Sequence, residues 1–101
     1  MRSVSILNLE LEEILQMLLM TKKRTLINFY KNNKHVAYIY LDEDGYVMCS
    51  YEEYRDYDAL DNLVLEQKLL SAEIIFDPIV KSEFMKCYKI PLLDYLFSRL
   101  F

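Results

Sequence analysis

The sequence predicts a single α+β domain: an N-terminal helix, a three-stranded antiparallel meander, a second helix, a further strand and a C-terminal helix. Apolar residues recur at helical spacing near both ends and after residue 57, but alternate with period two between residues 25 and 51. The composition, 53% hydrophobic and 28% charged, is typical of a compact core under a charged surface. No repeat or low-complexity tract divides the 101 residues, so we expect one domain over residues 1–101.

The first predicted element is an amphipathic helix from Leu9 to Met20. Asn8 is the predicted N-cap, glutamates occupy the first turn, and the basic run Lys22–Arg24 follows the end, so charges at both termini oppose the helix dipole. One face of this helix is apolar at the spacing i, i+3, i+4, i+7 and i+8. Its members are Leu11, Ile14, Leu15, Leu18 and Leu19.

Three alternating segments rich in aromatic and β-branched residues follow, and they are predicted to be strands. They are Thr25–Tyr30, His35–Leu41 and Tyr46–Tyr51. The turns between them are Lys31–Lys34 and Asp42–Gly45, and Gly45 supplies the positive φ of a tight hairpin. The second strand carries apolar bulk on both faces, which predicts a central position in the sheet.

The second half of the chain is predicted to hold two helices and one strand. A helix spans about Asp58–Leu70 with Asp58 as its cap, and the strand Ala72–Asp77 follows. Residues 79–89 favour no single assignment, and Pro91 opens a last helix because proline suits the first helical position. That helix has an apolar stripe made of Leu92, Leu93, Leu96, Phe97, Leu100 and Phe101.

Composition excludes several classes of function. One glycine and two prolines leave no glycine-rich loop to cradle a phosphate, so P-loop and dinucleotide-binding turns are excluded. No run approaches the roughly 18 apolar residues that a membrane crossing needs, and the start of the chain lacks the pattern of a secretory leader. We therefore expect no membrane insertion and a cytoplasmic location.

Residues that carry chemistry are sparse and scattered. The single histidine, His35, lies at the mouth of a predicted hairpin without an acid or nucleophile at a suitable spacing. Cys49 and Cys87 stand far apart, which indicates free, buried thiols. The acidic run Asp42–Asp44 lacks the ligand spacing of a calcium loop. The sequence therefore predicts no catalytic residue, cofactor, metal ligand or small-molecule substrate, and hence no enzyme.

Tyrosine content indicates a surface for protein contacts. The chain has nine tyrosines, and tyrosine is enriched where protein surfaces meet. Tyr51, Tyr54 and Tyr57 cluster before the second predicted helix, next to the acidic Asp58 and Asp61. The acidic cluster forms either a solvated, helix-capping face or a docking patch for a basic partner; its members are Glu52, Glu53, Asp56, Asp58 and Asp61. The tyrosines form either a lid over one edge of the core or a contact surface.

The C-terminal stripe is the other candidate contact surface. Leu96, Leu100 and Phe101 must pack on the sheet of the same chain, on a second copy or on a foreign partner. A helix lying on a membrane surface is disfavoured, because Arg99 is the only basic residue along it.

Nucleic acid is the alternative partner. A net charge of −4 opposes broad phosphate binding. Two local basic clusters remain, Lys22–Arg24 and Lys31–His35, with Tyr30 and Tyr38 nearby to stack on bases. A small nucleic-acid-binding regulator that uses these turns is therefore the second hypothesis.

Over about Ile6–Pro78 the chain resembles the PATAN domain, a domain family found in bacterial response regulators and related signalling and motility proteins. The resemblance rests on the order of five segments: Leu9–Leu19, Thr21–Arg24, Ile39–Cys49 with its glycine at Gly45, Asp58–Leu60 and Ala72–Phe76. The chain lacks the glycine that members usually carry where Arg24 stands. The resemblance implies a non-enzymatic module without a cofactor that mediates protein contacts.

The leading hypothesis is thus a protein-interaction module of bacterial signalling or motility, with a protein partner or a second copy as its ligand. Its predicted contact residues are those of the tyrosine-rich segment and of the last helix.

Overall fold

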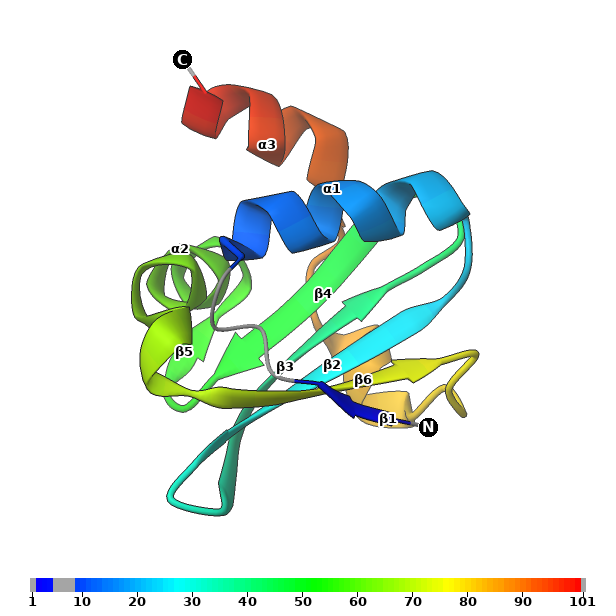
Figure 1. Cartoon of the computed structure of the whole chain (residues 1–101). Helices are drawn as coiled ribbons and strands as arrows, with labels where there is room; N and C mark the ends of the chain where they lie inside the picture. The colour runs from blue at the N-terminus through cyan, green and yellow to red at the C-terminus, as the bar shows by residue number, and fades with distance from the viewer. Residues whose placement is uncertain (1, 5–8, 101) are drawn as a thin grey trace.

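The computed structural model describes residues 2–4 and 9–100. In these residues the fold is α+β: three α-helices lie on one face of an antiparallel sheet (Figure 1). The helices are α1 (Leu11–Thr21), α2 (Asp56–Glu66) and α3 (Leu92–Leu100), with short 3₁₀ turns η1 (Gln67–Leu69) and η2 (Ser82–Lys86). The strands are β1 (Arg2–Val4), β2 (Thr25–Lys31), β3 (Lys34–Leu41), β4 (Tyr46–Tyr51), β5 (Tyr54–Arg55), β6 (Ser71–Phe76) and β7 (Ile90–Pro91).

The predicted meander is confirmed as β2, β3 and β4. Asn32 and Asn33 both have positive φ, 52° and 65°, which is the backbone of a type I′ turn between β2 and β3. Gly45 has a φ of 88° in the second turn, as its position after Asp44 predicts. The carboxylate of Asp42 also accepts hydrogen bonds from the backbone amides of Asp44 and Tyr46, both at 2.9 Å, and these two bonds fix the second turn.

The strand order is β1-β6-β2-β3-β4-β5, so β3 is central as predicted. The late strand β6 returns beside β2, with Ile74 opposite Ile27, and β1 pairs with the other side of β6. Both β5 and β7 pair with β4: Arg55 lies opposite Ser50, and Pro91 lies opposite Tyr46. The two short strands therefore occupy opposite ends of β4.

Helix α1 begins two residues later than predicted. Glu10 is the N-cap, and its amide donates to Glu13 Oε1 at 3.1 Å, so the first turn caps itself. The predicted cap, Asn8, lies outside the described residues. At the other end Lys22 takes the left-handed conformation, with a φ of 56°.

Helix α2 begins earlier than predicted, at Asp56, with Arg55 as its N-cap in place of Asp58. The reason is β5: pairing of Tyr54 with Tyr51 leads the chain directly into the helix. The α-helix ends at Glu66, and the predicted last turn is the 3₁₀ turn η1.

Helix α3 begins at Leu92, because Pro91 belongs to β7. The amide of Leu92 donates to the carbonyl of Gly45 at 3.0 Å, which ties the start of α3 to the β3–β4 turn. The last helix is thus confirmed, but the prediction that it begins at Pro91 is wrong by one residue.

The sheet carries apolar clusters on both faces. The larger cluster lies under the helices and includes Leu15, Ile39 and Leu60. The smaller cluster lies on the opposite face, where Phe84 of η2 is 1% exposed. Its ring stacks on Tyr40 with centroids 4.9 Å apart. The unassigned stretch of residues 79–89 therefore contains the segment that covers the second face of the sheet.

Candidate functional site

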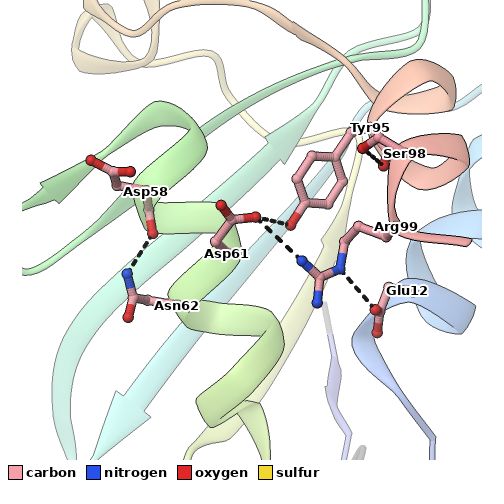
Figure 2. A network of polar contacts seen from close by, with 7 residues as sticks. All are labelled: Glu12, Asp58, Asp61, Asn62, Tyr95, Ser98 and Arg99. Atoms are coloured by element: carbon pink, nitrogen blue, oxygen red, sulfur yellow. Dashed lines mark hydrogen bonds and ion pairs between the residues drawn. The ribbon is translucent and has the colours of Figure 1, made fainter. Parts of the chain in front are cut away.

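The three helices meet at a polar cluster of Glu12, Asp61, Tyr95 and Arg99, called here the helix clamp (Figure 2). The Tyr95 hydroxyl donates to Asp61 Oδ1 at 2.6 Å, and Arg99 Nη1 lies 3.5 Å from the same oxygen. Arg99 Nε donates to Glu12 Oε2 at 3.1 Å. One residue pair thus joins α3 to α1, and two pairs join α3 to α2.

The electrostatics of the clamp favour the protonation states that hold it together. Burial, and then the hydrogen bond to Asp61, raise the pKa of Tyr95 above its ordinary value. Burial lowers the pKa of Arg99, but the hydrogen bond to Glu12 and the nearby carboxylates outweigh it, so that the net shift is upward. At neutral pH the phenol is therefore a donor and the guanidinium is charged.

A groove of about 280 Å³ lies between α1 and α3. It is lined by Glu10, Glu12, Glu13, Gln16, Leu96 and Arg99. Leu93 at the start of α3 lines a separate cavity with Leu19 and Lys22 at the end of α1. The two helices therefore run antiparallel, as Figure 1 shows, and the clamp lies at the groove end where α1 begins.

The two helices that form this groove also carry exposed apolar side chains outside its lining. On α1, Met17 and Met20 are 61% and 82% exposed. Met17 follows Glu13 of the groove by four residues and Met20 follows Gln16 by four, so each shares a helical face with a lining residue. On α3, Leu93 and Phe97 are 54% and 53% exposed. The inner faces of both helices are already buried in the core, so these four side chains form a second, outward apolar surface.

The rim of the groove is acidic. Glu12 is neutralised by Arg99, and Glu10 pairs with Lys68 at 3.0 Å on the surface. Within residues 2–4 and 9–100, Glu13 beside the groove and Asp94 on the exposed side of α3 take part in no ion pair. The rim therefore carries uncompensated negative charge next to apolar side chains.

Three of the predicted contact residues make contacts within the fold. Tyr51 is 2% exposed, and its hydroxyl donates to Glu66 Oε1 at 2.7 Å. Leu96 is 5% exposed in the main core and reaches only the floor of the groove. Asp61 belongs to the helix clamp. Because both side chains are buried, a partner of the folded domain cannot contact Tyr51 or most of Leu96.

The remaining predicted contact residues lie near the surface. Tyr54 and Tyr57 are 36% and 44% exposed, and the ring centroid of Tyr57 lies 6.3 Å from that of Tyr95. Asp58 is exposed, and its backbone carbonyl accepts a hydrogen bond from the side-chain amide of Asn62 at 2.8 Å. The side chain of Leu100 and the whole of Phe101 lie outside the described residues.

The sequence pattern missed Glu12, Met17 and Met20 as parts of the site. Leu93 and Phe97 did stand in the predicted stripe, because it spanned more of the helix circumference than the core can cover. Arg99 stood out only as the sole basic residue of the last helix. A single signal pointed to α1: two methionines on the side of the helix away from its leucine face.

The two basic clusters lie at opposite ends of β2 and make no continuous surface. Thr25 and Lys31 bound this strand, whose six residue steps span about 20 Å. Tyr38 is 8% exposed against Phe84, so it offers no face for a base. The hydroxyl of Tyr30 donates to Glu73 at 3.3 Å, which places a carboxylate beside the second cluster. The predicted nucleic-acid surface is therefore divided.

The described residues offer no group of three or more His, Cys, Asp and Glu side chains placed to hold a metal ion. Cys49 is a buried free thiol, as predicted, and burial raises its pKa; Cys87 is free but only half-buried. None of the helices in the described ranges has the length and apolar character that a membrane crossing requires.

Comparison of the chain with protein-family models, with curated proteins and with solved structures found no match.

Proposed function

We propose that this chain is a non-enzymatic protein-interaction module whose α1–α3 groove binds an amphipathic helix of a partner protein. The partner helix carries lysine or arginine beside its apolar face. One observation supports this above all: exposed apolar side chains on two packed antiparallel helices adjoin a rim with uncompensated carboxylates.

The apolar part of the surface supplies the driving force. Met17, Met20, Leu93 and Phe97 are each at least half exposed on helices that have already buried their inner faces. A helix laid into a groove contacts both walls through residues at i, i+3, i+4 and i+7. Methionine suits such a surface because its flexible side chain adapts to the shape of the partner.

The helix clamp supports binding by fixing the groove in advance. Hydrogen bonds from Tyr95 and Arg99 hold α3 against α2 and α1 without any ligand. A preformed groove loses less conformational entropy on binding than a mobile helix would. The affinity for a partner should therefore also depend on Tyr95 and Asp61, the two clamp residues that do not line the groove.

Charge selects the kind of partner. In the part of the chain that the structure describes, Glu13 and Asp94 take part in no ion pair, and the whole chain has a net charge of −4. A second copy would bring the same acidic rim against itself, and like charges at an interface oppose association. Charge thus favours a foreign basic helix over a homodimer. We further propose, from the resemblance to the PATAN domain, that this partner belongs to a bacterial signalling or motility pathway in the cytoplasm.

The test uses two labelled helical peptides with the same apolar face. One carries lysines at the flanking positions and the other carries glutamates. Fluorescence anisotropy should show that the full chain binds the lysine peptide at least about tenfold more tightly, a difference of roughly 1.4 kcal/mol. Binding of the lysine peptide should weaken as salt is added.

Matched variants locate the binding surface. Phe97→Ser should weaken binding of the lysine peptide, whereas Ile79→Ser, at a residue that is 88% exposed beyond the helices, should leave it unchanged. Equal affinity for the two peptides, or an equal loss in both variants, contradicts the proposal. A chain that binds neither peptide and self-associates through Phe97 would instead be a homodimer.

A further inference from the structure

A second cavity, of about 420 Å³, lies on the opposite face of the sheet, between η2 and the β4–β5 hairpin. Its volume falls in the range of small-molecule sites, roughly 300–1,000 Å³. Three separate parts of the chain line it, and its polar lining includes Tyr38, Ser50, Arg55, Asp56, Glu83 and Lys86. Neither the helix clamp nor the α1–α3 groove contributes a residue to this cavity.

The four charged side chains of this cavity do not neutralise one another. Arg55 and Lys86 are cationic, and Asp56 and Glu83 are anionic. The ion pairs among the described residues all lie elsewhere, at Lys68, Lys89 and Arg99. Opposite charges that line one cavity without pairing leave both signs available to a ligand.

Neutral partners hold two of these charges in place. Arg55 Nη1 donates to Ser50 Oγ at 2.6 Å and to the carbonyl of Glu52 at 3.4 Å. Asp56 Oδ1 accepts the amide of Tyr88 at 2.9 Å. These contacts fix the guanidinium and the carboxylate without cancelling their charges, which is the kind of preorganisation that a binding site requires.

Tyr38 adds a neutral polar group to the wall of this cavity. Its side chain is 8% exposed among Phe84 and the strands, and its hydroxyl lies 3.1 Å from Cys87 Sγ. Burial raises the pKa of this phenol, so it stays protonated at neutral pH. The hydroxyl is thus a neutral group beside the four charges.

We propose that this cavity binds a small zwitterion, a molecule with one carboxylate and one ammonium group, such as an amino acid. Arg55 and Lys86 take the carboxylate, because a guanidinium can donate two parallel hydrogen bonds to it. Asp56 and Glu83 take the ammonium group. A simple anion would compensate only the cationic pair and would be repelled by the two carboxylates, and a simple cation would meet the reverse problem.

The experiment follows backbone amide signals of the full chain by two-dimensional NMR. The probes are glycine, β-alanine and γ-aminobutyrate, which separate their two charges by increasing lengths. Propionate and propylammonium serve as single-charge controls at the same concentration and ionic strength. At least one zwitterion should shift the signals of Ser50, Arg55 and Cys87 in a saturable way, at least about tenfold more tightly than either control.

Variants test which groups bind each charge. Glu83→Gln should weaken zwitterion binding, because it removes the exposed carboxylate that faces the ammonium group. Propionate has no ammonium group, so its binding to this variant should not weaken. Arg55→Gln should abolish the response, whereas Lys81→Gln, outside the cavity lining, should not change it. No saturable shift with any of the three zwitterions overturns the proposal. So does an equal response to propionate, or an unchanged response in Glu83→Gln.

Discussion

The phenolic oxygen of Tyr95 lies 2.6 Å from Asp61 Oδ1, and this hydrogen bond joins α3 to α2 across 34 positions of the chain. Arg99, one turn further along α3, reaches Glu12 of α1. At its start α3 is tied to the sheet by the hydrogen bond from Leu92 to Gly45. The helix clamp therefore fixes the far end of α3 and, with it, the shape of the α1–α3 groove.

Loss of the Tyr95 hydroxyl should destabilise the domain. Tyr95→Phe removes a hydrogen bond to a carboxylate, which costs about 1.5 kcal/mol of unfolding free energy. Urea unfolding followed by circular dichroism measures it. Tyr88→Phe is the matched control, since this side chain is 59% exposed, and its change should stay under about 0.5 kcal/mol. Equal effects in the two variants would mean that the hydrogen bond from Tyr95 to Asp61 contributes nothing to stability.

Stability should fall at alkaline pH. Burial and then hydrogen bonds to carboxylates raise the pKa of Tyr51 and Tyr95 above their ordinary value of 10.0. The folded state thus keeps protons that the unfolded state releases. The contribution to stability is complete below about pH 10 and is lost as the pH rises toward the higher folded pKa values. Urea unfolding between about pH 8 and 11 should show this decline. Tyr51→Phe with Tyr95→Phe should make the decline shallower, and Tyr38, whose pKa is also raised, accounts for part of what remains.

The strongly periodic elements could be predicted from the sequence. The leucine spacing of α1, the alternation of β2 to β4 and the glycine of the second turn are local signals. The strands β1, β5 and β7 gave no such signal, because two or three residues are too few to show a period. η2 was missed because one residue, Phe84, does most of its packing.

The candidate site depended on contacts that no local pattern encodes. Glu12 and Arg99 are 87 positions apart, so their pairing follows only from the antiparallel packing of α1 and α3. Tyr51 and Leu96 were predicted as contact residues because tyrosine and leucine occur in cores and interfaces alike. The face of the sheet to which Tyr51 points and the side of α3 that packs inward are fixed only when the chain folds. Both place these side chains in the core.

Truncation of Phe84 should show that η2 covers the second face of the sheet. Phe84→Ala opens a cavity between Tyr38 and Tyr40 and should cost about 3 kcal/mol of unfolding free energy. The near-ultraviolet circular dichroism of the tyrosines should weaken as well. Met85→Ala, on a neighbour that is 64% exposed, should change little. If both variants are equally mild, η2 is not part of the core.

The single glycine should tolerate no side chain. Gly45 has a φ of 88°, and a Cβ atom there would lie 3.3 Å from Leu19 Cδ1. Gly45→Ala should therefore lower the unfolding free energy by about 1 kcal/mol or more, since both the backbone and the packing oppose it. Chemical unfolding measures the loss, and Glu43→Ala in the same turn is the control. A stability equal to that of the natural chain would show that the turn relaxes without cost.

The most direct test of the charge-complementary groove is to reverse the charge of Glu13, which caps the first turn of α1 but takes part in no ion pair among the described residues. Anisotropy titrations would measure the affinities of the lysine and glutamate peptides for the natural chain, for Glu13→Lys and for the control Glu53→Lys. The control makes the same charge change at an exposed residue outside the groove lining. The account predicts that Glu13→Lys weakens binding of the lysine peptide and strengthens binding of the glutamate peptide. Glu53→Lys should change neither affinity. An unchanged preference in Glu13→Lys, or the same change in both variants, would contradict it.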